Sequence, residues 1–136
     1  MSKRKVAILP CTGIGQVVGT IARQAAYSVC EDARPENTLL VCLPALVKGV
    51  QEDIEMVRDC PVIVIEGCKE FCATHALQLQ GGKASATVSV VELIKGKGIT
   101  IRRESRRQLT HSEQIVVDLV VNKVVAEVDK LSSEAP

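Results

Sequence analysis

Four of the six cysteines in this chain occupy positions from which their sulfur atoms could act together: Cys11, Cys42, Cys68 and Cys72. Cysteine thiolates bind metal ions such as Zn²⁺, and they also carry thiol–disulfide chemistry. The spacing of Cys68 and Cys72 predicts that both lie on one face of a helix, one turn apart. Cys11 and Cys42 must reach the same place through the fold, so the secondary structure decides whether a site forms.

Short β-branched runs alternate with helical stretches along the chain, which is typical of proteins built from β-α-β units. We expect strands over residues 5–10, 38–42, 62–65 and 86–94. We expect helices over residues 15–31, 44–58 with a break at Gly49, 68–80, and from Thr110 or Ser112 to Lys130. Residues 132–136 are expected to form a frayed tail.

This pattern predicts one α/β domain over residues 1–136, with three layers and helices on both faces of the sheet. The sheet is expected to be mainly parallel and Rossmann-like, with about four strands. We prefer the strand order 2-1-3-4 and leave open whether the fourth strand is parallel or antiparallel.

The four cysteines fall where such a sheet would gather them. Cys11 follows the first expected strand, Cys42 ends the second and Cys68 follows the third. The carboxyl ends of parallel strands lie on one edge of the sheet, where ligand sites form. Because Zn²⁺ prefers four ligands in a tetrahedron, the sequence predicts a zinc site made by Cys11, Cys42, Cys68 and Cys72. A helix beginning at Cys68 would also favour its thiolate form.

Other residues of similar chemistry fit this site less well. Cys30 falls late in the first helix and Cys60 precedes the third strand, at the opposite edge, so we interpret both as ordinary thiols. His75 follows Cys72 on the same helix face and is a candidate ligand, ligand-bonding group or proton carrier. We favour the simpler interpretation of His75 as a polar residue at the helix edge.

Two other kinds of chemistry remain open for the same sulfur atoms. Cys68 could be the nucleophile and Cys72 the resolving thiol of a redox or sulfur-transfer protein. Alternatively, the four thiolates could hold an iron–sulfur cluster. The sequence does not decide whether the chain is an enzyme.

The cysteine segments resemble those of the DGC-domain proteins, a family described as zinc-binding. That family shows a cysteine-serine-glycine turn, then a cysteine-leucine pair, then aspartate-glycine-cysteine with another cysteine four positions on. The matching segments here are Cys11-Thr12-Gly13, Cys42-Leu43 and Glu66-Gly67-Cys68 with Cys72. Glu66 replaces the aspartate and Thr12 the serine, while all four cysteines remain. The resemblance implies metal binding and implies no reaction. If the site is partly open, we expect a role in metal homeostasis or sensing.

The turn after the first strand also imitates a dinucleotide-binding fingerprint, with Gly13, Gly15 and Gly19. The acidic residue expected at the end of the second strand is missing, and Cys42 stands near that place. We therefore interpret the glycines as residues that let the turn close and the helix approach the sheet.

Composition limits the partners that can be expected. The chain has 136 residues and a net charge of +1, with one Phe, one Tyr and no Trp, so nucleic acid binding is not expected. No apolar run is long enough for a membrane span or a signal peptide, so we expect a cytoplasmic protein. Arg102, Arg103, Arg106 and Arg107 could form a docking surface for a protein partner, although a solvated loop or edge strand is the preferred interpretation.

Overall fold

The computed structural model describes residues 4–134, and its centre is a parallel four-stranded sheet in the order β2-β1-β3-β4. The strands are β1 (Val6–Pro10), β2 (Thr38–Leu40), β3 (Val62–Glu66) and β4 (Ala86–Ser89). The helices are α1 (Val17–Tyr27), the π-helical η1 (Ser28–Ala33), α2 (Leu43–Lys48), α3 (Gln51–Asp59), α4 (Cys72–Leu79), α5 (Val90–Ile94) and α6 (His111–Ser133). The predicted α/β class and strand order are confirmed, and β4 is parallel to β3.

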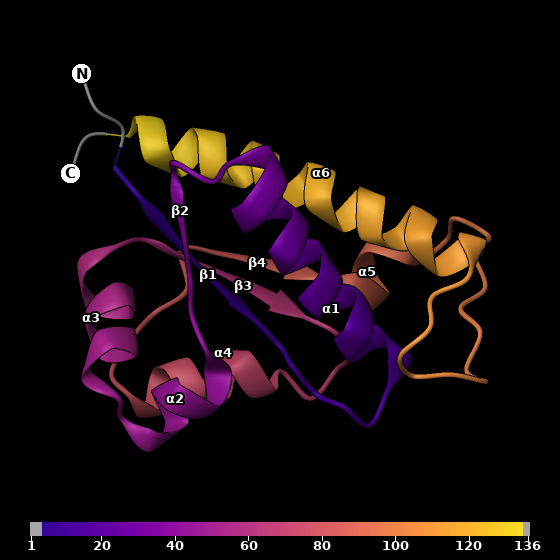
Figure 1. The fold of residues 1–136 in the computed structure, drawn as a ribbon, viewed down its shortest axis with the longest axis horizontal. Coiled ribbons are helices and arrows are strands. Elements are labelled where there is room, and N and C mark those ends of the chain that lie inside the picture. Colours follow the sequence, from indigo (N-terminus) through magenta and orange to yellow (C-terminus); the bar gives the residue numbers. More distant parts are fainter. Residues whose placement is uncertain (1–3, 135–136) are drawn as a thin grey trace.

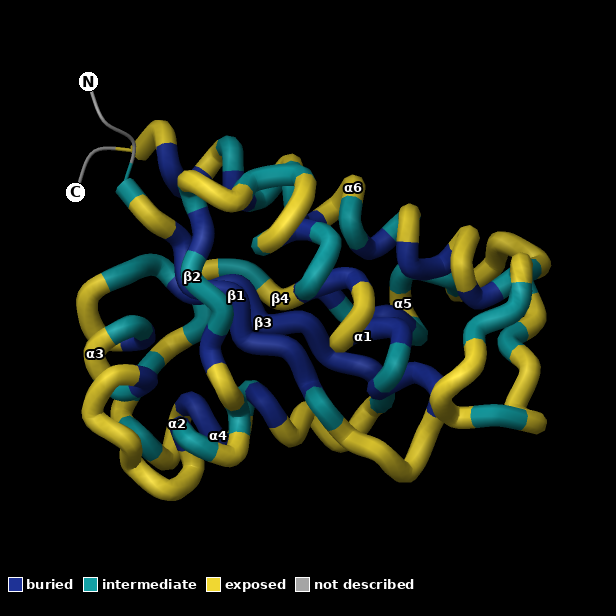
Figure 2. The backbone as a smooth tube through the Cα atoms, viewed as in Figure 1, coloured by how far each residue is buried: buried dark blue, intermediate teal, exposed yellow. Residues whose placement is uncertain are grey.

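Helices cover both faces of the sheet (Figure 1). The sheet therefore separates the hydrophobic core into two parts, one on each face. Val6 and Ile8 of β1 pack with side chains of α1 and α6. Ala7 and Leu9 point the opposite way, into a cluster with side chains of α2, α3 and α4. This alternation is the two-residue period of a strand, and burial on both faces explains the continuous apolar runs of β1 and β3. Figure 2 shows both strands buried inside a shell of more exposed helices and loops.

The prediction of one strand over residues 86–94 is wrong beyond Ser89. The chain turns there into the short helix α5, and the Ser89 side chain accepts a hydrogen bond from the Glu92 N–H at 3.4 Å. A serine followed three residues later by glutamate is a helix-start pattern, which two adjacent valines concealed. Because Val90 is fully buried in the α1–α6 part of the core, packing overrides the strand preference of these valines.

The other helix predictions differ mainly at their ends. The break at Gly49 is confirmed, because Gly49 has a left-handed backbone with φ of 90° between α2 and α3. At the start of α6, the Glu113 carboxylate accepts hydrogen bonds from the N–H and hydroxyl of Thr110, so Thr110 is the cap. The expected frayed tail is helical as far as Ser133, with Ser132 buried, while residues 135–136 lie outside the described part of the chain.

Among residues 4–134, no helix combines the length and the apolar character that crossing a membrane requires.

Candidate functional site

The parallel sheet brings the segments that carry the cysteines to one edge. Cys11 directly follows β1, and its N–H donates a hydrogen bond to the carbonyl oxygen of Ile65 in β3 at 2.7 Å. Cys68 lies two residues beyond β3, and Cys42 lies two residues beyond β2. Since β2 and β3 are the two neighbours of β1, the three loops leave the sheet side by side.

Cys11, Cys68 and Cys72 belong to the segments that follow β1 and β3 at this edge, but they are not grouped closely enough to hold a metal ion. The pKa of the Cys72 thiol is raised, first by partial desolvation and then by the negative charges of Cys11 and Cys68, with Glu66 and Glu70 adding to the effect. Cys11 is buried, Cys68 is partly buried and Cys72 is exposed.

Cys42 stands apart from the other three cysteines. Its backbone is fixed, because the Cys42 N–H donates a hydrogen bond at 2.9 Å to Oδ2 of the buried Asp53 in α3. Its side chain is exposed and lines a cavity of about 290 Å³ together with Thr12, the residue after Cys11. Within the part of the chain that the structure describes, no three His, Cys, Asp or Glu side chains are grouped so that they could hold a metal ion.

Glu66 determines where the helix after β3 begins. Its side chain is almost completely buried, and its carboxylate accepts hydrogen bonds from the Ala73 N–H at 3.3 Å and the Thr74 N–H at 2.8 Å. These amides lie in the first turn of α4, where N–H groups have no partner within the helix. Glu66 therefore caps α4, although it is six residues away from Cys72, the first residue of the helix.

The prediction of a helix from residue 68 is consequently wrong at its start. Phe71 has a left-handed backbone with φ of 54°, and Cys68 lies in a turn before the helix. Cys68 and Cys72 therefore do not occupy the same helix face. The cysteine in the first turn of α4 is Cys72, and its thiol pKa is raised, so the helix-start argument for Cys68 as a nucleophile fails.

The glycine-rich turn after β1 is packed against α1 and the β3 loop. A Cβ atom on Gly19 would lie 2.0 Å from the carbonyl oxygen of Gly13. A Cβ atom on Gly67 would lie 3.0 Å from the backbone carbonyl of Val18. The interpretation of the glycines as residues that allow close packing is confirmed for Gly19, whereas no atom lies within 4 Å of a Cβ atom placed on Gly15. Gly19 and Gly67 let the loops of Cys11 and Cys68 lie against the start of α1.

The remaining sulfur and imidazole groups lie elsewhere or point to solvent. Cys30 belongs to η1 and Cys60 precedes β3, at the opposite edge from the cluster, and burial raises the pKa of both thiols. His75 is exposed on α4, and His111 is exposed at the start of α6. The sequence did not predict that Glu66 caps α4 or that Asp53 holds the backbone of Cys42. An acidic residue ending a buried apolar strand is a signal for Glu66, whereas nothing in the sequence singles out Asp53.

A comparison with protein families finds a match to the DGC domain over residues 7–118, which is most of the chain. No curated protein and no solved structure gave a significant match. The match includes all four rim cysteines, together with Asp53 and Glu66, which hold two of their loops. The chain therefore belongs to the DGC domain family.

Proposed function

We propose that this protein binds Zn²⁺ through the thiolates of Cys11, Cys42, Cys68 and Cys72. The observation that carries the proposal is the strand order, which brings the loops of Cys11, Cys42 and Cys68 to one edge of the sheet. Cys72 follows Cys68 by four residues, and the Cys42 loop lies beside the Cys11 loop. Four thiols also match the ligand number and ligand type of structural zinc sites.

The residues fit zinc by their chemistry, but their sulfur atoms must move closer together to bind it. Zinc–sulfur bonds are about 2.3 Å long, and no such grouping exists among residues 4–134. The Cys42 side chain is exposed, while its backbone is held by Asp53, so its sulfur atom would approach the others by side-chain rotation and by movement of the rim loops. Zinc binding would therefore order the rim loops on top of a sheet that is already folded.

The repulsion between thiolates also favours a bound metal ion at this site. Gathering several thiolates in one place is unfavourable, and the pKa of Cys72 is raised first by desolvation and then by the charges of Cys11 and Cys68. A bound divalent cation supplies the positive charge that offsets this repulsion. Two of the four side chains, Cys42 and Cys72, are exposed, so the ion has direct access from solvent. An accessible site suits metal exchange, and we therefore propose a role in metal homeostasis or sensing.

Measuring the metal content of the purified protein tests this proposal. The protein should be prepared without oxygen and without a metal-affinity column, then analysed for zinc and iron by plasma mass spectrometry. We expect about one zinc ion per chain, lost in Cys68→Ser and retained in Cys60→Ser. Cys60 is a suitable control because it is also partly buried but lies at the opposite edge of the sheet. Iron in place of zinc would identify a cluster protein, and a metal-free protein with six titratable thiols would refute metal binding.

A further inference from the structure

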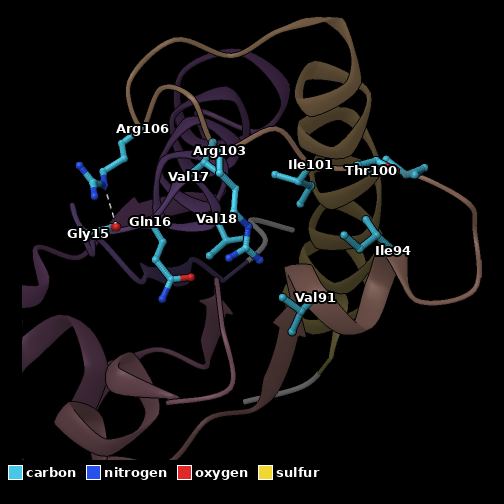
Figure 3. A pocket seen from close by; sticks show the side chains of 11 residues that line it. Gly15, Gln16, Val17, Val18, Val91, Ile94, Thr100, Ile101, Arg103 and Arg106 are labelled. Atoms are coloured by element: carbon cyan, nitrogen blue, oxygen red, sulfur yellow. Dashed lines mark hydrogen bonds between the residues drawn. The ribbon is translucent and has the colours of Figure 1, made fainter.

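A second site candidate lies beside the N-terminal end of α1, and no cysteine lines it. It is a cavity of about 510 Å³ between α1, α5 and residues 99–106, here called the α1 cavity. Much of its wall is apolar, formed by Val91 and Ile94 of α5 and by Ile101 of the following loop (Figure 3). Its volume is in the range of small-molecule sites, which commonly combine apolar walls with a few polar groups.

Two arginine side chains add positive charge to the α1 cavity, whose lining also includes the polar residues Gln16 and Thr100. Figure 3 shows Arg103 extending from the loop into the space beside Val18, with Arg106 above Gly15. The Arg106 Nε–H donates a hydrogen bond to the Gly15 carbonyl oxygen at 2.8 Å, which leaves its terminal N–H groups for another acceptor. Among residues 4–134, neither arginine forms an ion pair with a carboxylate.

The loop that carries these arginines is attached to α1. The Thr20 hydroxyl donates a hydrogen bond to the backbone carbonyl oxygen of Arg106, in addition to the contact between Arg106 and Gly15. Further along the chain, the buried Glu113 carboxylate accepts a hydrogen bond from the Arg102 N–H at 3.1 Å. These hydrogen bonds hold the backbone on both sides of Arg103 and keep this residue beside the cavity.

The end of α1 adds to the positive potential created by the arginines. This helix has no acidic residue in its first turn, and Gln16 makes no side-chain cap to the described residues. The Gly19 N–H donates a hydrogen bond to the Gln16 carbonyl oxygen at 3.1 Å, but the N–H groups of the first two residues of a helix have no internal partner, and the helix dipole is positive at this end. Val17 and Val18, the first two residues of α1, both line the cavity.

We propose that the α1 cavity binds a small phosphate monoester with an apolar organic group. The phosphate lies beside the guanidinium group of Arg103 and the first turn of α1, because a guanidinium and a helix N-terminus both favour this dianion, and Arg106 adds positive charge at the edge of the cavity. The organic group packs against Val91, Ile94 and Ile101. No cysteine lines this cavity, so the proposal does not depend on metal binding.

Titration with three simple probes, followed by backbone NMR and calorimetry, tests the proposal. The probes are n-butyl phosphate, inorganic phosphate and pentanoate, which separate the contributions of the phosphate and of the apolar chain. We expect n-butyl phosphate to bind at least about tenfold more tightly than either of the others. Its chemical-shift changes should centre on the amides of Val17 and Val18. Equal affinity for inorganic phosphate would overturn the apolar part, and tighter binding of pentanoate would overturn the phosphate part.

Variants decide whether binding occurs in this cavity. Arg103→Gln should weaken n-butyl phosphate binding at least about tenfold, because a charged hydrogen-bonding partner is lost. Lys97→Gln removes the same charge from an exposed position in the same loop that does not line the cavity, and should bind as the unmodified protein does. Cys68→Ser should also bind normally, whatever its metal content. Thermal unfolding verifies that each variant is folded. Equal weakening in Arg103→Gln and Lys97→Gln, or no saturable binding, would refute the site.

Discussion

The carboxylate of Glu66 accepts two hydrogen bonds from Thr74, one from its backbone N–H at 2.8 Å and one from its hydroxyl at 2.7 Å. Glu66 is the last residue of β3 and Thr74 lies in the first turn of α4. The contact therefore closes the loop that contains Cys68 and places Cys72 at the start of the helix. A buried carboxylate that satisfies helix N–H groups contributes to stability and to the position of both cysteines.

Replacing Glu66 should destabilise the protein strongly. Glu66→Ala leaves the donors of Ala73 and Thr74 without an acceptor in a buried place, so we expect a loss of about 2–4 kcal/mol in the free energy of unfolding. Thr74→Val removes only the hydroxyl bond and should cost about 1 kcal/mol. Urea unfolding followed by circular dichroism measures both values. A Glu66→Ala midpoint equal to that of Thr74→Val would contradict the capping role.

The turn after β1 should tolerate a methyl group at Gly15 but not at Gly19. Gly19→Ala would place Cβ 2.0 Å from the Gly13 carbonyl oxygen, so the backbone of the turn must shift. We expect a loss of about 2 kcal/mol or more, as in other overpacked sites. At Gly15, no atom lies within 4 Å of an added Cβ, so Gly15→Ala should change stability by less than about 0.5 kcal/mol. Thermal unfolding of the two variants compares these positions directly, and similar melting temperatures would argue against close packing at Gly19.

Metal binding should depend on Cys42 and not on Cys30. Cys42 is exposed at the rim, so Cys42→Ser should lower the zinc content with little effect on the stability of the metal-free protein. Cys30 lies in η1, on the far side of the domain from the rim loops, so Cys30→Ser should leave the zinc content unchanged. Plasma mass spectrometry after dialysis against a weak chelator gives both values. The same zinc content in the two variants would remove Cys42 from the proposed site.

Protonation of the Glu113 carboxylate should make the protein less stable in acid. Burial alone would raise its pKa, but hydrogen bonds from Thr110 and from the Arg102 N–H, together with the Arg102 charge, lower it below the ordinary value of 4.5. A carboxyl group whose pKa is lowered by folding stabilises the native state above the unfolded pKa. This contribution is lost as the pH falls through the folded value.

Unfolding experiments between pH 7 and pH 3 measure this effect. The free energy of unfolding should decline below about pH 4.5, and Glu113→Gln should be less stable at neutral pH with a flatter acid dependence. The variant retains a side chain of similar size, so the comparison isolates the ionised group. If both proteins lost stability in parallel as the pH fell, another carboxylate would be responsible for the acid dependence.

The sequence by itself was sufficient to predict the strand order and the edge that carries the cysteines, but not the direction or the end of β4. Continuous β-branched runs indicate strands buried on both faces, and the helices between the first three strands favour parallel pairing. The strand ends then place Cys11, Cys42 and Cys68 at one edge without any knowledge of side-chain contacts. Gly49 and Thr110 were predictable for a similar reason, because a left-handed turn and a helix cap depend on nearby residues.

Only the tertiary structure decided how the residues at that edge are arranged. The spacing of Cys68 and Cys72 suits a helix, but the buried carboxylate of Glu66 provides an acceptor that starts α4 at Cys72 instead. The α1 cavity likewise depends on a contact between Arg106 and Gly15, which are 91 residues apart in the chain. The periodicity of apolar residues in the sequence indicates which faces of the helices and strands are buried. Hydrogen bonds between distant segments form only in the packed fold. These hydrogen bonds position the groups that could bind a ligand.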